Sequence, residues 1–126
     1  LIGLVGSEMC IETDFIRCSF YELVSRYLSS CYTFAIEQNN SAGRSDFEMA
    51  GIPGTDYYTD DRVVEFKYYR GKDAERMLSL SEPLPEHVEQ VKGYAEDTKR
   101  KFPNYNVRTY VVYICSNKGW KCWEVY

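Results

Sequence analysis

The sequence predicts an α+β (α/β) domain built around one sheet. Apolar residues recur at three- and four-residue steps over about 14–30, which is typical of an amphipathic helix. A second helix is expected to open at Pro85 or Glu86 and to run to about Phe102. The remaining segments contain alternating or β-branched runs bounded by turn residues, which predict strands. The resulting order, αβββ(α)αββ, is that of helices and strands sharing one core.

Size and composition also predict a single globular domain. The chain has 126 residues, of which 44% are hydrophobic and 27% charged, so a disordered or fibrous chain is excluded. We divide it into a linker or N-terminal cap at 1–13 and a folded domain at 14–126. The net charge of -4 excludes a broad basic surface for nucleic acid, although local basic patches remain open.

Each element follows from its local pattern. Thr13 or Asp14 can cap the first helix, and the second long helix opens at Pro85 with its basic residues near the end, as the helix dipole favours. An acidic loop is expected to continue to Asp61. The expected strands are 31–38, 44–52, 62–69, 107–115 and 120–126, with a short helix or ordered loop at 71–80.

The cysteines and the first residues indicate the compartment. Five cysteines without a CxxC pair predict reduced thiols in a cytoplasmic protein, with neither a disulfide framework nor a zinc site. Cys115 and Cys122 are expected to face each other across the final hairpin. The apolar run Leu1 to Val5 is too short for a membrane span, and the missing initiator Met suggests the end piece of a longer protein.

The segment from Asp46 to Lys67 carries the most informative chemistry. Side chains alternate along a strand, so Glu65 and Lys67 share a face while Phe66 points to the core. If strands 44–52 and 62–69 pair as a hairpin, Asp46 lies beside Glu65. Two carboxylates with a backbone carbonyl and water suit Mg²⁺, and Lys67 can orient a water or offset phosphoryl charge. The competing interpretation is a solvated strand face with an ion pair, and these residues alone leave both open.

The second long helix adds a QxxxY pattern. Gln90 and Tyr94 lie on one helix face, where an amide and a phenol can reach a phosphate, a base or a metal-bound water. Alone, the pattern favours a half-buried tyrosine beside a surface glutamine. His87, the single histidine, is expected at the surface. Arg70 and Lys72 follow Lys67 closely and are candidates for phosphate contacts.

Together these motifs resemble the PD-(D/E)XK nuclease superfamily over about residues 15 to 125. The sequence runs Gly43-Arg44-Ser45-Asp46, then Glu65-Phe66-Lys67, then Gln90 to Tyr94, in the order of that superfamily. In particular it is similar to the nuclease-like domains at the C-terminus of bacterial AAA-ATPase-like proteins, which also have a Glu in the first strand, here Glu37. No proline precedes Asp46, which departs from the motif's name.

The resemblance implies a restriction-endonuclease-like αβββαβ core with a mixed central sheet flanked by helices. It also implies that Asp46, Glu65 and the Phe66 carbonyl bind Mg²⁺ or Mn²⁺, and that Lys67 is the catalytic lysine, assisted by Gln90 and Tyr94. The auxiliary candidates are Glu22, Glu37 and Arg44, and the candidates for binding substrate phosphates are Arg70 and Lys72.

The function expected from this resemblance is Mg²⁺-dependent hydrolysis of phosphodiester bonds, with DNA ahead of RNA as substrate. An upstream ATPase-like domain of the same chain is an expected partner, and no membrane is involved. The alternative is a catalytically weak or inactive nuclease-like module that serves binding or regulation within a larger ATPase-like protein.

Overall fold

The computed structural model describes residues 18–40 and 43–125. The predicted linker at 1–13 and residues 14–17 of the first predicted helix lie outside the described residues. That helix is described over residues 18–28, called here the N-terminal helix. The labelled elements are β1 (Tyr32–Asn40), β2 (Gly43–Gly51), β3 (Asp60–Tyr69), α2 (Lys72–Leu78), α3 (Pro85–Lys101), β4 (Asn106–Cys115) and β5 (Gly119–Glu124).

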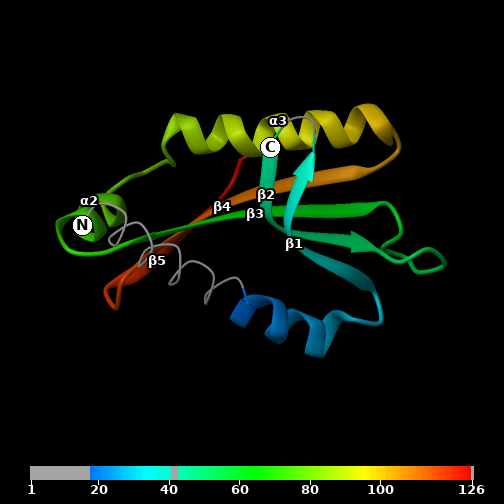
Figure 1. The fold of residues 1–126 in the computed structure, drawn as a ribbon, viewed down its shortest axis with the longest axis horizontal. Coiled ribbons are helices and arrows are strands. Elements are labelled where there is room, and N and C mark those ends of the chain that lie inside the picture. The colour runs from blue at the N-terminus through cyan, green and yellow to red at the C-terminus, as the bar shows by residue number, and fades with distance from the viewer. Residues whose placement is uncertain (1–17, 41–42, 126) are drawn as a thin grey trace.

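The strands form one five-stranded mixed sheet in the order β1-β2-β3-β4-β5. Only β3 and β4 are parallel, and the other neighbours are antiparallel. Parallel neighbours need a long crossover, which α2 and α3 supply between β3 and β4 (Figure 1). The predicted α+β class and the mixed sheet flanked by helices are therefore confirmed.

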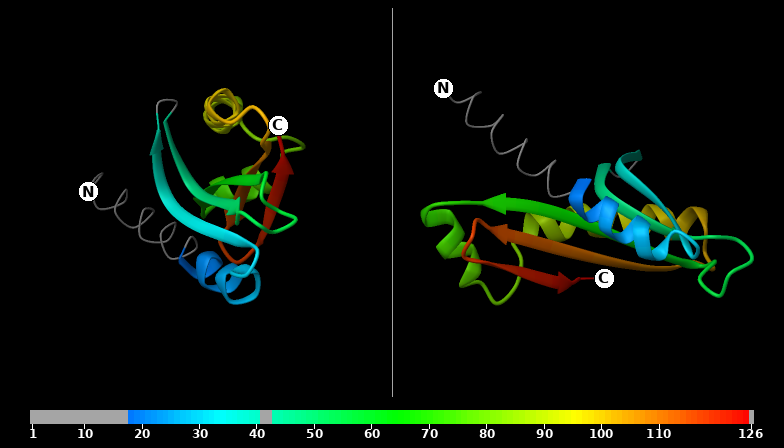
Figure 2. Two further views of the ribbon diagram at one scale, coloured as in Figure 1. Left: turned by 90° about the vertical axis from the view of Figure 1, so that its right-hand side faces the viewer. Right: turned by 90° about the horizontal axis from the view of Figure 1, so that it is seen from below.

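Helices cover both faces of the sheet. Seen end on, α3 lies above the sheet and the N-terminal helix lies below it (Figure 2, left). Helix α3 packs on β4, β2 and β3, and we call the sheet surface beneath it the α3 face. We call the surface toward the N-terminal helix the opposite face.

Each face has its own hydrophobic cluster. On the α3 face, Val91 of α3 and Met77 of α2 pack with Val111 and Tyr113 of β4. On the opposite face, the buried rings of β2 and β3 pack against the N-terminal helix. The ring of Phe20 lies 4.9 Å from that of Phe47 and 5.3 Å from that of Phe66. The sheet is thus buried from both sides, and alternate residues of one strand serve different clusters.

The predicted second long helix is confirmed as α3. Pro85 occupies its first turn, Glu86 is acidic there, and Lys99 to Lys101 stand in the last turn. Acidic residues near the N-terminus and basic residues near the C-terminus of a helix interact favourably with its dipole. Val91, Tyr94 and Ala95 are buried on its inner side, so packing on the sheet fixes which residues the helix presents to β2 and β3.

Two local predictions were wrong. β3 begins at Asp60, so Asp60 and Asp61 belong to the strand and not to a loop, because pairing continues to Asn106 and Val107 of β4. Cys115 and Cys122 do not face each other, because Cys115 pairs with Gly119 and Cys122 pairs with Val112. Cys115 is buried, whereas Cys122 is exposed.

No helix in the part of the chain that the structure describes is both long enough and apolar enough to cross a lipid bilayer.

Candidate active site

The predicted acid–lysine pair lies on the α3 face of β3. The Nζ atom of Lys67 is 3.0 Å from Oε1 of Glu65. The Glu65 side chain is 2% exposed and that of Lys67 is 33% exposed, so the ammonium reaches toward solvent while the carboxylate is enclosed. Phe66 points to the opposite face, where it is buried against Phe20. Strand alternation therefore separates the charged pair from the apolar ring, as predicted.

Asp46 lies in β2, next to the strand that carries Glu65. The β2–β3 register runs from Ala50–Asp61 to Phe47–Val64, and Asp46 and Glu65 are the residues that come next on each strand. The Asp46 side chain itself is outside the described residues. The meeting of the two carboxylates therefore stays a prediction, although the strand pairing that it requires is present.

Tyr94 of the QxxxY pattern is buried between α3 and the sheet, and it is 7% exposed. Its hydroxyl shares a hydrogen bond with Glu48 of β2 and another with Thr98 one helical turn later. Burial and the negative charge of Glu48 raise the pKa of Tyr94. Gln90, one turn earlier on the same helix, is half-buried. The pattern thus brings Tyr94 onto the face that carries Glu65.

Asp61 joins the same polar group. It is 1% exposed and hydrogen-bonds to Glu48. Burial, followed by the hydrogen bond and charge of Glu48 and the charge of Asp60, raises the pKa of Asp61 to about 9. Asp61 is therefore protonated at neutral pH and can donate its proton to the Glu48 carboxylate.

His87 is buried on the inner side of α3, so its predicted surface position was wrong. Its Nδ1 atom is 2.6 Å from the hydroxyl of Tyr113, whose oxygen also accepts the Leu84 N–H at 2.9 Å. Burial, together with the nearby charge of Lys67, lowers the pKa of His87. The neutral imidazole is therefore favoured, and its Nδ1 shares a hydrogen bond with the Tyr113 hydroxyl.

The remaining predicted residues lie apart from this group or outside the described side chains. Glu22 is exposed on the N-terminal helix, which packs on the opposite face, and its Oε1 is 2.7 Å from Nη2 of Arg26. Arg70 and Lys72 are exposed just after β3, at the start of α2. The side chains of Glu37 and Arg44 are outside the described residues, while their backbones lie in β1 and β2.

Sequence reasoning missed Glu48, Asp61 and the His87–Tyr113 pair. Glu48 could have been found, because it is two residues after Asp46 and alternation puts both on one face. Asp61 could have been found only if the predicted strand 62–69 had begun at Asp60, where β3 begins. No local signal identified His87, since its burial depends on where α3 crosses β4.

The chemistry of this face is that of oxygen donors beside one ammonium group. Within residues 18–40 and 43–125, taken without the side chains that are not described there, no three acidic, histidine or cysteine side chains converge to hold a metal. Glu65 is nevertheless a carboxylate of the kind that Mg²⁺ and Mn²⁺ bind.

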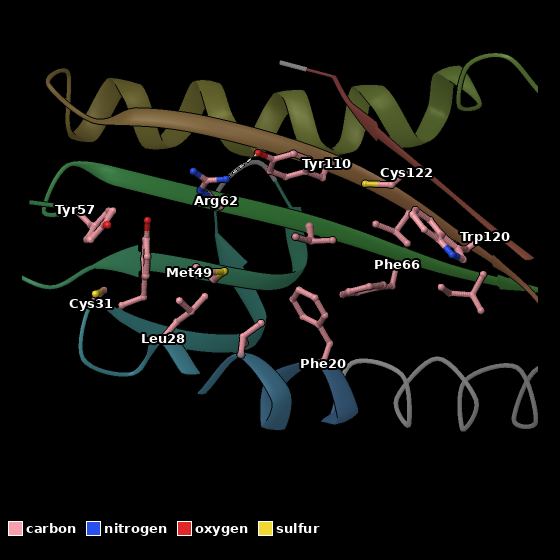
Figure 3. A pocket seen from close by; sticks show the side chains of 15 residues that line it. Phe20, Leu28, Cys31, Met49, Tyr57, Arg62, Phe66, Tyr110, Trp120 and Cys122 are labelled. Atoms are coloured by element: carbon pink, nitrogen blue, oxygen red, sulfur yellow. Dashed lines mark hydrogen bonds between the residues drawn. The ribbon is translucent and has the colours of Figure 1, made fainter. Parts of the chain in front are cut away.

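A large, mainly apolar cavity lies on the other side of the sheet. It has a volume of about 690 Å³ and lies between the opposite face and the N-terminal helix (Figure 3). Its walls are mainly apolar, with Phe20, Met49 and Phe66 among them, and its polar edge is Arg62, which donates to the Tyr110 hydroxyl at 3.1 Å. Among the predicted site residues whose side chains are described, Phe66 alone lines this cavity.

Comparison with known families identifies a match over most of the chain. The model of the PD-(D/E)XK nuclease superfamily matches residues 12–124. Comparison with curated proteins and with solved structures gave no match.

Proposed function

Because the chain belongs to the PD-(D/E)XK nuclease superfamily, we propose that it is a Mg²⁺-dependent nuclease that hydrolyses phosphodiester bonds of DNA. The observation that carries the proposal is the Glu65–Lys67 pair. A carboxylate that is 2% exposed is held 3.0 Å from an ammonium on the strand that follows the Asp46 strand. Members of the superfamily typically depend on a divalent metal.

The donor set fits such a metal. Asp46 and Glu65 would hold Mg²⁺ or Mn²⁺ with the backbone carbonyl of Phe66, because hard divalent cations select oxygen ligands. The bound ion would supply an activated water and would stabilise charge on the phosphate. Enclosure of Glu65 under α3 favours this, since a buried carboxylate gains strongly from a cation beside it.

The protein's own groups orient the substrate. Lys67 is one-third exposed, so its ammonium can donate hydrogen bonds to the scissile phosphate while Glu65 keeps it in place. Gln90 and Tyr94 approach from α3 as auxiliary groups. Arg70 and Lys72, exposed beyond the end of β3, would contact phosphates further along the strand. Glu37 and Arg44 remain auxiliary candidates, whereas Glu22 lies on the N-terminal helix.

The test is cleavage of supercoiled plasmid with Mg²⁺. We expect nicking by the wild type and a loss of roughly 100-fold or more in Lys67→Ala, because Lys67 would stabilise developing charge. Lys92→Ala is the matched control, since Lys92 is exposed on the outer side of α3. Equal nicking by the wild type and Lys67→Ala would reject the proposed role of Lys67.

Metal binding provides a second, independent measurement. Titration calorimetry with Mn²⁺ should give one clear site that is lost in Asp46→Asn and kept in Asp56→Asn, which changes an exposed turn residue. A parallel cleavage assay on RNA of matched sequence distinguishes a deoxyribonuclease from a ribonuclease, and DNA is expected to be the better substrate.

A second candidate function is a nuclease-like module that binds or regulates within a larger ATPase-like protein. The net charge of -4 favours it, because such a surface attracts a polyanion only weakly. The same charge supports an upstream ATPase-like domain as the source of DNA affinity in an active enzyme. Absence of both plasmid nicking and a Mn²⁺ site would favour the module.

A further inference from the structure

Glu48 and Asp61 lie beside the proposed metal site without belonging to its motifs. Glu48 follows Asp46 by two residues and pairs with Val63 of β3. Asp61 and Glu65 stand on either side of Val63 along the same strand face. Helix α3 packs on β2 and β3, and the half-buried Glu48 hydrogen-bonds both to Asp61 of β3 and to Tyr94 of α3.

The hydrogen bonds around Glu48 have a definite direction. The Tyr94 hydroxyl donates to Glu48, since this bond raises the pKa of the phenol. Thr98 donates to the Tyr94 oxygen, since that bond lowers it. Protonated Asp61 donates to Glu48 from the other side. Glu48 therefore accepts from two buried donors and holds the Tyr94 hydroxyl in one orientation.

Stability does not account for the acid at position 61. Asp61 is 1% exposed, and its Oδ1 atom has no hydrogen-bond partner among the described residues. Burying such an oxygen destabilises the fold, whereas an apolar side chain of similar volume at this position would avoid the penalty. That penalty falls on Asp61, and its hydrogen bond to Glu48 links it to Tyr94.

We propose that Glu48 and Asp61 are positioning residues that orient the Tyr94 hydroxyl, and with it the QxxxY side of α3, over the Glu65–Lys67 pair. Glu48 acts directly through its bond to Tyr94, and Asp61 acts by holding Glu48. The effect on the reaction rests on the proposed nuclease function, while the hydrogen-bonded chain from Asp61 to Thr98 can be tested without it.

Matched variants separate hydrogen bonding from charge and from packing. In Glu48→Gln the amide oxygen can accept from Tyr94 and the amide nitrogen can donate to Asp61, whereas Glu48→Leu removes both bonds. In Asp61→Asn the amide still donates to Glu48, whereas Asp61→Leu does not. We expect kcat for plasmid nicking to fall about 10- to 100-fold in both leucine variants, as for a misplaced catalytic group.

The KM for plasmid should stay near the wild-type value in all four variants, and Glu48→Gln and Asp61→Asn should recover most of kcat. Mn²⁺ affinity by calorimetry should be unchanged in Glu48→Leu. Loss of the Mn²⁺ site in that variant would make Glu48 a metal ligand and overturn the positioning role. Unchanged kcat in both leucine variants would overturn it as well.

A double-mutant cycle tests the orientation of Tyr94 directly. Tyr94→Phe and Glu48→Leu should each shift the urea midpoint, and the double variant should shift it by less than the sum, because both changes remove the same bond. Additive shifts would overturn the inference. If the wild type does not nick DNA or bind Mn²⁺ but the cycle is non-additive, the proposed function fails and the positioning of Tyr94 stands.

Discussion

The two faces of the sheet are built from the same strands but have opposite chemistry. In β3, Val64 and Phe66 point to the opposite face, which is apolar and encloses a cavity of about 690 Å³. Their neighbours Glu65 and Lys67 point to the α3 face, where buried carboxyl, phenol and imidazole groups gather. The cavity of the opposite face therefore does not coincide with the candidate active site, which contains most of the buried polar groups.

The largest effect on stability is expected on the apolar face. Phe47 is fully buried and packs against the ring of Phe20. Phe47→Ala should lower the free energy of unfolding by about 3–5 kcal/mol, since it removes a large side chain and leaves a void. Urea unfolding measures this. Leu23→Ala, at a position that is 55% exposed, is the control and should change stability by about 0.5 kcal/mol or less.

Asp61 on the α3 face should make the stability of the fold depend on pH. Between the ordinary pKa of 3.8 and the folded value of about 9, folded Asp61 keeps a proton that the unfolded chain releases. Its contribution to stability is thus complete below the lower value and is lost as pH rises toward the upper one. The Tm of the wild type should fall from about pH 5 to about pH 8 more steeply than that of Asp61→Asn. Parallel curves would contradict a proton on Asp61.

His87 gives the opposite pH dependence. Its pKa is lowered from the ordinary 6.5, so the unfolded chain binds a proton before the folded protein does. Stability should therefore be complete above pH 6.5 and decline as pH falls. Because the chain has one histidine, NMR titration of the imidazole protons reports its pKa directly. A midpoint at or above 6.5 would place His87 outside the buried contact with Tyr113.

The smallest effect is expected at Glu22, on the surface of the N-terminal helix. Its ion pair with Arg26 is exposed on both sides. Glu22→Ala should change the free energy of unfolding by about 0.5 kcal/mol or less, because solvent screens such pairs. Plasmid nicking should be unaltered. A large loss of nicking would mean that the N-terminal helix reaches the active site and that the two faces are not separate.

Local patterns in the sequence were sufficient for much of this architecture. The period of the first helix and the charge order of α3 depend on neighbours within a few positions. The same holds for the alternation around Glu65, Phe66 and Lys67 and for the turn residues between strands. The order of the elements and the separation of the charged pair from the Phe66 ring followed from them. The strand pairing that brings β2 beside β3 agreed with the predicted hairpin.

Other features depend on contacts between distant segments. From the sequence, Asp61 was predicted to lie in an acidic loop, but its pairing with Val107 makes it part of β3. Cys115 and Cys122 were predicted to face each other, but the register of the last hairpin pairs them with other residues. His87 was predicted to lie at the surface, but the packing of α3 on β4 brings it into contact with Tyr113.

The sequence by itself thus determined the fold class, the family and the residues whose chemistry suits a nuclease, because periodicity and motif spacing are local properties of the chain. Only the tertiary structure decided which polar groups are buried together. Burial and hydrogen-bond partners come from the packing of α3 on the sheet, and these contacts set the protonation of Asp61 and His87 and the orientation of Tyr94.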